Sequence, residues 1–211
     1  MNTPGQNSNA VAELVFGMTV MMARNLYNGT SGTELKGKKL GIHAFGQVGR
    51  NVARIAKGFG MEVFAFDPYC PASVMEAEGV KPITDINELY STCQYVSLHI
   101  PATNETKKSI NYALLKQMPK GAMLINTARK EVINEEELVQ IMDERPDFRY
   151  VSDITPDNAS VFAEKFTGRY FFTPKKMGAQ TAEANINAGI AAAKQSVGFL
   201  KEGIDKFKVN K

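Results

Sequence analysis

Residues 40–49, LGIHAFGQVG, decide the fold of this chain of 211 residues. An apolar segment of β character runs into a turn that contains two glycines, and the following residues repeat apolar side chains at helical spacing. A second apolar segment, 62–67, comes after that helix and ends at an aspartate. A strand, a glycine turn, a helix and a second strand in this order predict a parallel βαβ unit.

The alternation of strands and helices continues along the chain. The expected strands are 40–45, 62–67, 95–100, 122–127, 150–154 and 170–173. Helical patterns lie between them, most clearly at 48–59 and 135–142. Apolar strands alternating with amphipathic helices indicate an α/β fold, a doubly wound parallel sheet of the Rossmann type. We expect this sheet domain at 31–180, a linker and helix at 1–30, and a C-terminal helix at 181–211 with an apolar stripe from Ile186 to Phe207.

The first helix is expected over 10–23, with Asn7 or Asn9 as its cap. Its apolar run has 14 residues, includes Glu13 and is too short to span a bilayer. No charged side chain occurs in residues 1–9, so we also expect no secretory signal. Because its apolar residues cover more than one face, we expect a missing domain or a second subunit to cover the helix. This pattern predicts a homodimer with no membrane partner.

Composition excludes several other classes. The 25 Lys and Arg residues exceed the 22 Asp and Glu residues by only three, too weak a charge to indicate a nucleic-acid partner. Cys70 and Cys93 have neither the number nor the spacing of a disulfide scaffold or a zinc site. We therefore expect no metal and a reducing, cytoplasmic location.

The turn at 44–49 has the features of a dinucleotide-binding site. Gly46 would let backbone N–H groups approach a pyrophosphate, and Gly49 would let the helix pack on the strand; Gln47 and Val48 open that helix. Asp67, which lies 18 residues after Gly49, would accept hydrogen bonds from ribose hydroxyls. Because Pro68 and Tyr69 follow Asp67 rather than a basic residue, the expected cofactor is NAD rather than NADP. The alternative is close helix packing without a ligand, and Ala44 in place of the usual first glycine weakens the motif.

Five segments, the glycine turn among them, make the chain similar to a known family. They are Pro4-Gly5-Gln6-Asn7 with 11–13, the modified glycine turn, Ser97–Pro101 with Glu105-Thr106, Asn126–Arg129, and Thr173-Pro174 with Gly178–Thr181. In this order and spacing they resemble the D-2-hydroxyacid dehydrogenases, which bind NAD and a small-molecule substrate. Within that family the chain looks most like the short D-3-phosphoglycerate dehydrogenases that have lysine in place of the catalytic histidine.

The resemblance implies roles for residues outside the glycine turn. The cofactor pocket would include His99, Pro101, Thr106, Thr127, Ala128, Asp153 and Gly178, with Asp153 against the nicotinamide carboxamide. A capping role for Asp153 and a turn role for the substrate candidate Asn7 are close alternatives. His43 lies inside the first expected strand and is interpreted as a core residue.

The resemblance also implies a catalytic pair, Arg129 and Lys175, which would both bind substrate. An arginine at a strand end can hold a carboxylate bidentately, although a surface arginine is the simpler reading. Lys175 follows Thr173-Pro174 and would be the base in oxidation. Ordinary lysines are protonated at neutral pH, so this role needs desolvation or nearby cations, for which Lys176, Arg129 and the nicotinamide ring are the candidates. The alternative is a solvated basic turn at 175–176.

The chain departs from the family pattern in three places. By this resemblance we expect the family's first lobe, about a hundred residues and half of the substrate site, to be missing, and we expect the end at Val209-Asn210 to match the family's end with no regulatory domain after it. Lys130 replaces a usual glycine, and only Asp157 lies near the position of the glutamate that orients the family's histidine. Two functions stay open: a D-3-phosphoglycerate dehydrogenase whose NAD-binding portion is this chain, and an NAD-binding module without turnover. A glyoxylate or hydroxypyruvate reductase is the nearest competing enzyme.

Overall fold

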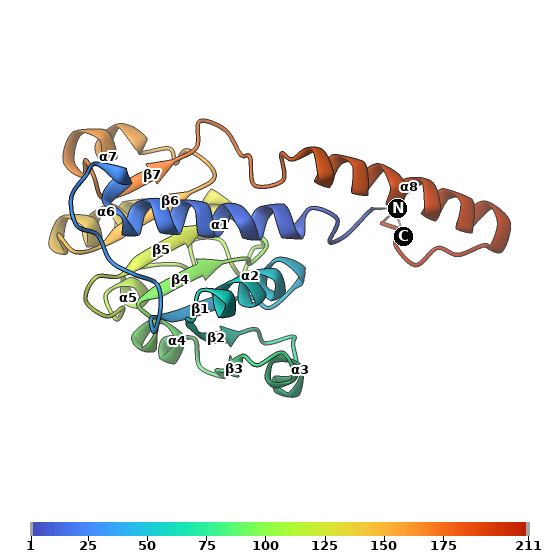
Figure 1. Cartoon of the computed structure of the whole chain (residues 1–211), viewed down its shortest axis with the longest axis horizontal. Helices are drawn as coiled ribbons and strands as arrows, with labels where there is room; N and C mark the ends of the chain where they lie inside the picture. Colours follow the sequence, from blue (N-terminus) through green and yellow to red (C-terminus); the bar gives the residue numbers. More distant parts are fainter. Residues whose placement is uncertain (1, 210–211) are drawn as a thin grey trace.

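The computed structural model of the chain describes residues 2–209 and contains one seven-stranded parallel sheet (Figure 1). The strands are β1 Lys39–His43, β2 Glu62–Phe66, β3 Lys81–Pro82, β4 Tyr95–Leu98, β5 Met123–Asn126, β6 Arg149–Ser152 and β7 Tyr170–Phe172. Their order is β3-β2-β1-β4-β5-β6-β7, which reverses direction between β1 and β4. Ligands of open parallel sheets bind at this reversal, beyond the carboxyl ends of the strands. The predicted doubly wound α/β fold is confirmed.

Helices cover both faces of the sheet (Figure 1). The longer ones are α1 Ser8–Ala23, α2 Gln47–Gly58, α4 Ile86–Thr92, α6 Glu135–Glu144, α7 Ala159–Lys165 and α8 Ala182–Glu202. The shorter ones are α3 Ala72–Ala77, α5 Tyr112–Leu115 and the 3-10 turns η1 Asn25–Tyr27 and η2 Lys130–Val132. One apolar cluster joins α1 and α2 to the sheet, and a second joins α4 to α7 to the opposite face.

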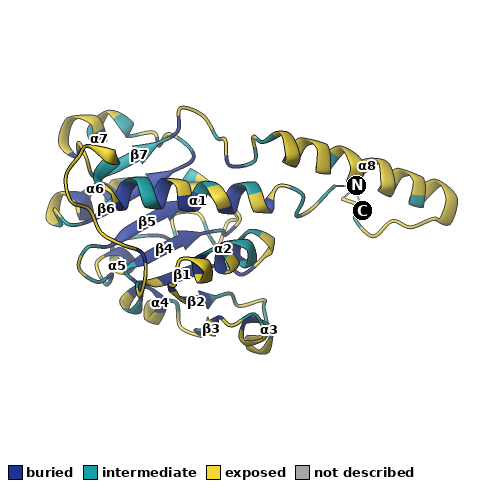
Figure 2. Cartoon of the chain, in the orientation of Figure 1, coloured by how far each residue is buried: buried dark blue, intermediate teal, exposed yellow. Residues whose placement is uncertain are grey.

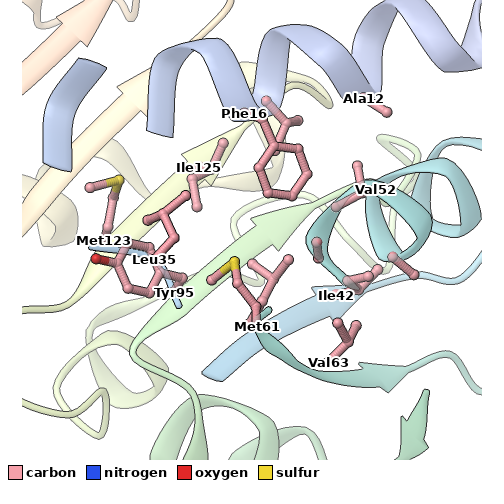
Figure 3. Close-up of a cluster of buried hydrophobic side chains, with 14 of the residues drawn as sticks. Ala12, Phe16, Leu35, Ile42, Val52, Met61, Val63, Tyr95, Met123 and Ile125 are labelled. Carbon is pink, nitrogen blue, oxygen red and sulfur yellow. The ribbon is translucent and has the colours of Figure 1, made fainter. Parts of the chain in front are cut away.

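Side chains along the central strands alternate between the two clusters. On β5, Met123 and Ile125 face α1 and α2, whereas Leu124 faces the other layer. Figure 3 shows Ile125 with Phe16 of α1 and Val52 of α2 in the first cluster. Because both faces are covered, β4 and β5 are buried at every position and apolar at most of them, which is why their sequences read as nearly continuous hydrophobic runs.

Helix α1 is covered by this chain itself, contrary to the expectation of an outside partner. It packs along α2 and over β5, β6 and β7, and buries Val11, Val15, Phe16, Met18 and Met22. The Phe16 ring also stacks on the ring of Phe59 at the end of α2, with 5.0 Å between centroids. The apolar residues on several faces of α1 are therefore no evidence for a second subunit.

All six expected strands are present, with each end within two residues of its predicted position, and β3 was missed because only two of its residues pair with β2. Helix α8 ends at Glu202, where Gly203 adopts a positive φ of 69°, so Ile204 and Phe207 lie beyond the helix. The helix projects from the sheet and is exposed along most of its length (Figure 2).

Asn210, which we expect to be part of the family's end, lies outside the described residues. Between residues 2 and 209, no helix has the length and apolarity that crossing a membrane requires.

Candidate functional site

The glycine turn after β1 has two tight constraints. Ala44 has φ of 80°, a conformation in which a side chain is strained and glycine is favoured. A Cβ at Gly49 would lie less than 3.0 Å from the carbonyl oxygen of Ala44 and 3.0 Å from Cγ2 of Ile42. Gly49 is thus required by the packing of α2 on β1, as the motif predicts.

Packing within the chain does not explain why residue 46 is a glycine. It is the N-cap of α2 with φ of −77°, and a Cβ built there would meet no protein atom within 4 Å. The open space lies at the amino end of α2, where free backbone N–H groups and the helix dipole favour an anion. The residues present therefore fit a cofactor pyrophosphate, as expected from Gly46, Gln47 and Val48.

Asp67 stands directly after β2 and faces the glycine turn. Its Oδ2 accepts a hydrogen bond from Phe45 N at 2.8 Å, and its Oδ1 accepts one from Tyr69 N at 2.9 Å. These bonds hold the half-buried carboxylate beside the turn. The structure thus brings Asp67 and Gly46 together, the arrangement that an adenosine ribose and its phosphate need.

Neither histidine has the properties of a base: His43 is buried in the sheet, and His99 is half-buried at its carboxyl edge. His43 lies between the rings of Phe66 and Tyr90, and burial lowers its pKa to about 4. Burial lowers the pKa of His99 to about 3, and its Nε2 lies 3.0 Å from Oγ of Ser97. Both rings are neutral at physiological pH, which confirms the core interpretation of His43.

The loop after β4 carries two of the expected cofactor residues. Thr106 Oγ1 donates to the carbonyl oxygen of Pro101 and accepts from Thr103 N at 2.8 Å. Thr106 therefore closes the loop that positions Pro101, so its hydroxyl has a structural task that the sequence did not reveal.

Asn126, the last residue of β5, shapes the segment that presents Arg129. Its Oδ1 accepts from Ala128 N at 2.9 Å, and its Nδ2 donates to the carbonyl oxygen of Arg129 at 3.2 Å. The Oγ1 of Thr127 is buried without a hydrogen-bond partner among the described residues. A buried hydroxyl of this kind is costly unless another group pairs with it, as a cofactor over this strand end would. Arg129 itself is exposed at the carboxyl edge of the sheet.

Both carboxylate oxygens of Asp153, which directly follows β6, accept hydrogen bonds from other groups of this chain. Its Oδ1 accepts from Nζ of Lys176 at 2.8 Å, and its Oδ2 accepts from Gly178 N at 3.0 Å. Lys176 also donates to the carbonyl oxygens of Thr127 and Ala128, at 3.1 and 2.8 Å. Sequence reasoning treated Lys176 only as a charge near Lys175. Because its ammonium is paired with a carboxylate, it is not the free cation that we expected there.

Lys175 is exposed on the segment after β7, and its carbonyl oxygen accepts from Oγ1 of Thr173 at 2.9 Å. The carboxylate of Asp157, which lies near the position of the family's glutamate in the sequence, pairs with Lys130. The ion pair therefore joins Lys130 and Asp157, two positions at which the sequence departs from the family pattern.

Asn7 is the exposed N-cap of α1 and lines a small cavity of about 130 Å³ with Gln180.

Comparison with known proteins agrees with this geometry. Residues 9–169 match the family model described as D-isomer specific 2-hydroxyacid dehydrogenase, NAD binding domain. The NAD⁺-bound crystal structure of 3-phosphoglycerate dehydrogenase from Entamoeba histolytica superposes with a TM-score of 0.92 and 48% identity, over the whole of this chain and 67% of that one.

Among curated proteins, the D-3-phosphoglycerate dehydrogenase of Methanocaldococcus jannaschii is 32% identical over all of this chain and 43% of its own length. The hydroxypyruvate reductase of Thermotoga maritima is 31% identical over 90% of this chain and 66% of its own length. The chain spans about two fifths of the length of the first curated relatives it matches.

Proposed function

Because this chain belongs to the family of NAD-binding domains of the D-isomer-specific 2-hydroxyacid dehydrogenases, we propose that it is the cofactor-binding portion of an enzyme that oxidises D-3-phosphoglycerate to 3-phosphohydroxypyruvate. The observation that carries the choice of substrate is the 48% identity, over the whole chain, to the NAD⁺-bound 3-phosphoglycerate dehydrogenase. NAD is the cofactor, and when bound it supplies the acceptor for the hydride that leaves C2 of the substrate.

Arg129 and Lys175 carry the remaining chemistry. Asn126 bonds the backbone carbonyl oxygen of Arg129 at the strand end, and the exposed guanidinium of Arg129 would bind the substrate carboxylate and stabilise charge on the developing carbonyl oxygen. Lys175 in its neutral form would take the proton of the C2 hydroxyl as the carbonyl forms, and would return it in the reverse reaction. Asn7 would contact substrate from the start of α1.

The cofactor residues divide between two halves of the sheet edge. Gly46, Gln47, Val48, Gly49 and Asp67 surround the carboxyl ends of β1 and β2 and would hold the adenosine and pyrophosphate half. The nicotinamide half would lie over β4, β5 and β6, against the proposed residues His99, Pro101, Thr106, Thr127, Ala128, Asp153 and Gly178.

The proposed organisation has three parts. Residues 31–180 form the NAD-binding domain and 1–30 a linker and helix beside it. Residues 181–211 would pack against a substrate lobe, which is consistent with the exposed apolar side chains of Ile186, Ile190, Val197 and Leu200 on α8.

Turnover tests the proposal. The chain alone, and the chain fused to the part of the Entamoeba relative that it does not cover, are supplied with NAD⁺ and D-3-phosphoglycerate while NADH absorbance is followed. We expect turnover by the fusion with a preference for 3-phosphoglycerate over glycerate. A fusion that binds NAD⁺ and folds but reduces hydroxypyruvate and glyoxylate in preference would refute the choice of substrate.

Two other functions compete. The short span of the chain relative to its curated relatives supports an NAD-binding module without turnover of its own, and turnover by the isolated chain would exclude that. The 31% identity to the Thermotoga hydroxypyruvate reductase supports a reductase of that kind.

We propose that the protein forms a homodimer and is located in the cytoplasm. Since α1 is buried within the chain, the dimer now depends on the family resemblance alone. Sedimentation velocity measures the assembly directly, and a monomer at micromolar concentration would remove the dimer from the proposal.

A further inference from the structure

Lys176 joins the three segments that follow β5, β6 and β7. Its Nζ donates to Thr127 O and Ala128 O after β5, and to Asp153 Oδ1 after β6, while its own backbone belongs to the segment after β7. All three of its donors are therefore used. The side chain is two-thirds buried, so the ammonium is held in one place rather than solvated.

The partner carboxylate is more deeply buried than the lysine. The Asp153 side chain is 1% exposed, and its second oxygen accepts from Gly178 N. A Cβ at Gly178 would come within 2.6 Å of that oxygen, so the glycine is what lets the backbone approach. Leaving either charge of a buried pair without its partner is costly, so Lys176 and Asp153 act as one neutral unit.

This unit lies at one end of the cofactor site. Asp67 and the glycine turn fix the adenosine and pyrophosphate half over β1 and β2. A dinucleotide that crosses the reversal point between β1 and β4 then places its second nucleoside over the ends of β4, β5 and β6, where Asp153 and Thr127 stand. Arg129 Nη1 also lies 3.5 Å from the carbonyl oxygen of Ala128 that Lys176 contacts, so the two cations are neighbours.

We infer that Lys176 is a positioning residue for the nicotinamide ring, an inference that rests on the proposed function. Lys176 holds the Asp153 carboxylate and the two carbonyl groups that precede Arg129. Its positive charge also cancels the negative charge of Asp153 beside the ring. The ring carries a positive charge in NAD⁺ and none in NADH. A neutral Lys176–Asp153 pair therefore keeps the site from favouring one oxidation state by charge. Breaking the pair from either side should shift the preference in opposite directions, because the charge left behind has opposite sign.

The experiment compares the affinities of the purified chain for NAD⁺, NADH and ADP-ribose by calorimetry at about pH 8. In Lys176→Met the remaining carboxylate should raise the ratio of the Kd for NADH to the Kd for NAD⁺ at least threefold. In Asp153→Asn the remaining ammonium should lower the same ratio at least threefold. The double variant lacks both charges, and Lys176→Arg keeps both; each should stay within twofold of the wild-type ratio.

ADP-ribose, which lacks the nicotinamide, is the internal control, and its Kd should stay within twofold in every variant that folds. If Lys176→Met does not fold, Lys176→Gln replaces it, because the amide can still donate to one of the carbonyls. The inference is wrong if either single variant leaves the ratio within twofold of wild type, or if both move it in the same direction. A wild-type chain that binds neither NAD⁺ nor ADP-ribose would instead overturn the proposed function.

Discussion

Replacing Gly46 with alanine should separate cofactor binding from folding. At this position the backbone has φ of −77°, which alanine adopts without strain, and the added Cβ would meet no protein atom within 4 Å. A Gly to Ala change at a compatible site stabilises a protein by about 0.4 to 1 kcal/mol through the unfolded chain. The folded domain should therefore be as stable as the wild type or slightly more so.

The methyl group would instead enter the space at the amino end of α2 where the pyrophosphate approaches the backbone. We expect the Kd for NAD⁺ to rise at least tenfold, which corresponds to about 1.4 kcal/mol. ADP-ribose should lose affinity equally, because it contains the same pyrophosphate.

Gly49→Ala is the matched contrast. Its Cβ would lie less than 3.0 Å from the carbonyl oxygen of Ala44, an atom of the main chain that cannot rotate away. Overpacking of this kind costs up to about 3 kcal/mol. For a chain of this size, 3 kcal/mol lowers Tm by about 6 to 12 °C.

Thermal unfolding by circular dichroism and titration calorimetry measure the two effects on the same samples. A Gly46→Ala variant that binds NAD⁺ as tightly as the wild type would contradict this prediction, since the open space would then have no pyrophosphate in it. A Gly46→Ala variant whose Tm falls as much as that of Gly49→Ala would also contradict it, because both glycines would then serve packing alone.

Three other predictions follow from the site and the core. Asp67→Asn removes the charge that opposes a 2′-phosphate while keeping an acceptor for Phe45 N, so the preference for NAD over NADP should fall at least tenfold by calorimetry; an unchanged preference would exclude Asp67 from the ribose site. Burial lowers the pKa of His43 to about 4, below the 6.5 of an unfolded histidine, so His43 should contribute about 3 kcal/mol to the fall in the free energy of unfolding from pH 6.5 toward pH 4, in addition to the loss from His99. Urea unfolding at a series of pH values measures this loss, and His43→Gln should flatten the curve; an equally steep curve would assign the loss to other groups. In the fusion that carries a substrate lobe, Lys175→Ala should reduce kcat at least a hundredfold with the Kd for NAD⁺ unchanged, and an unaffected kcat would show that Lys175 is not the base.

Local sequence determined the strands and the glycine turn. The runs at β1, β4 and β5 are mostly apolar because both faces of the sheet are covered, and this pattern is visible without coordinates. Gly46, Gly49 and Asp67 could be assigned because the motif depends on short-range spacing around one βαβ unit. Strand β3 was missed since two paired residues carry no periodic signal.

Contacts between distant segments were decided only by the tertiary structure. The sequence could not show that α1 is covered by α2 and the sheet, because an apolar helix face has the same composition whatever packs on it. Nor could it show that Lys130 pairs with Asp157, 27 positions later. The pairing of Lys176 with Asp153 is the clearest case: two ordinary charged residues 23 positions apart become one neutral unit because three parallel strands end at the same edge of the sheet. Spacing along the chain specifies which residues share one turn, whereas the charge of a site depends on which strand ends the fold brings together.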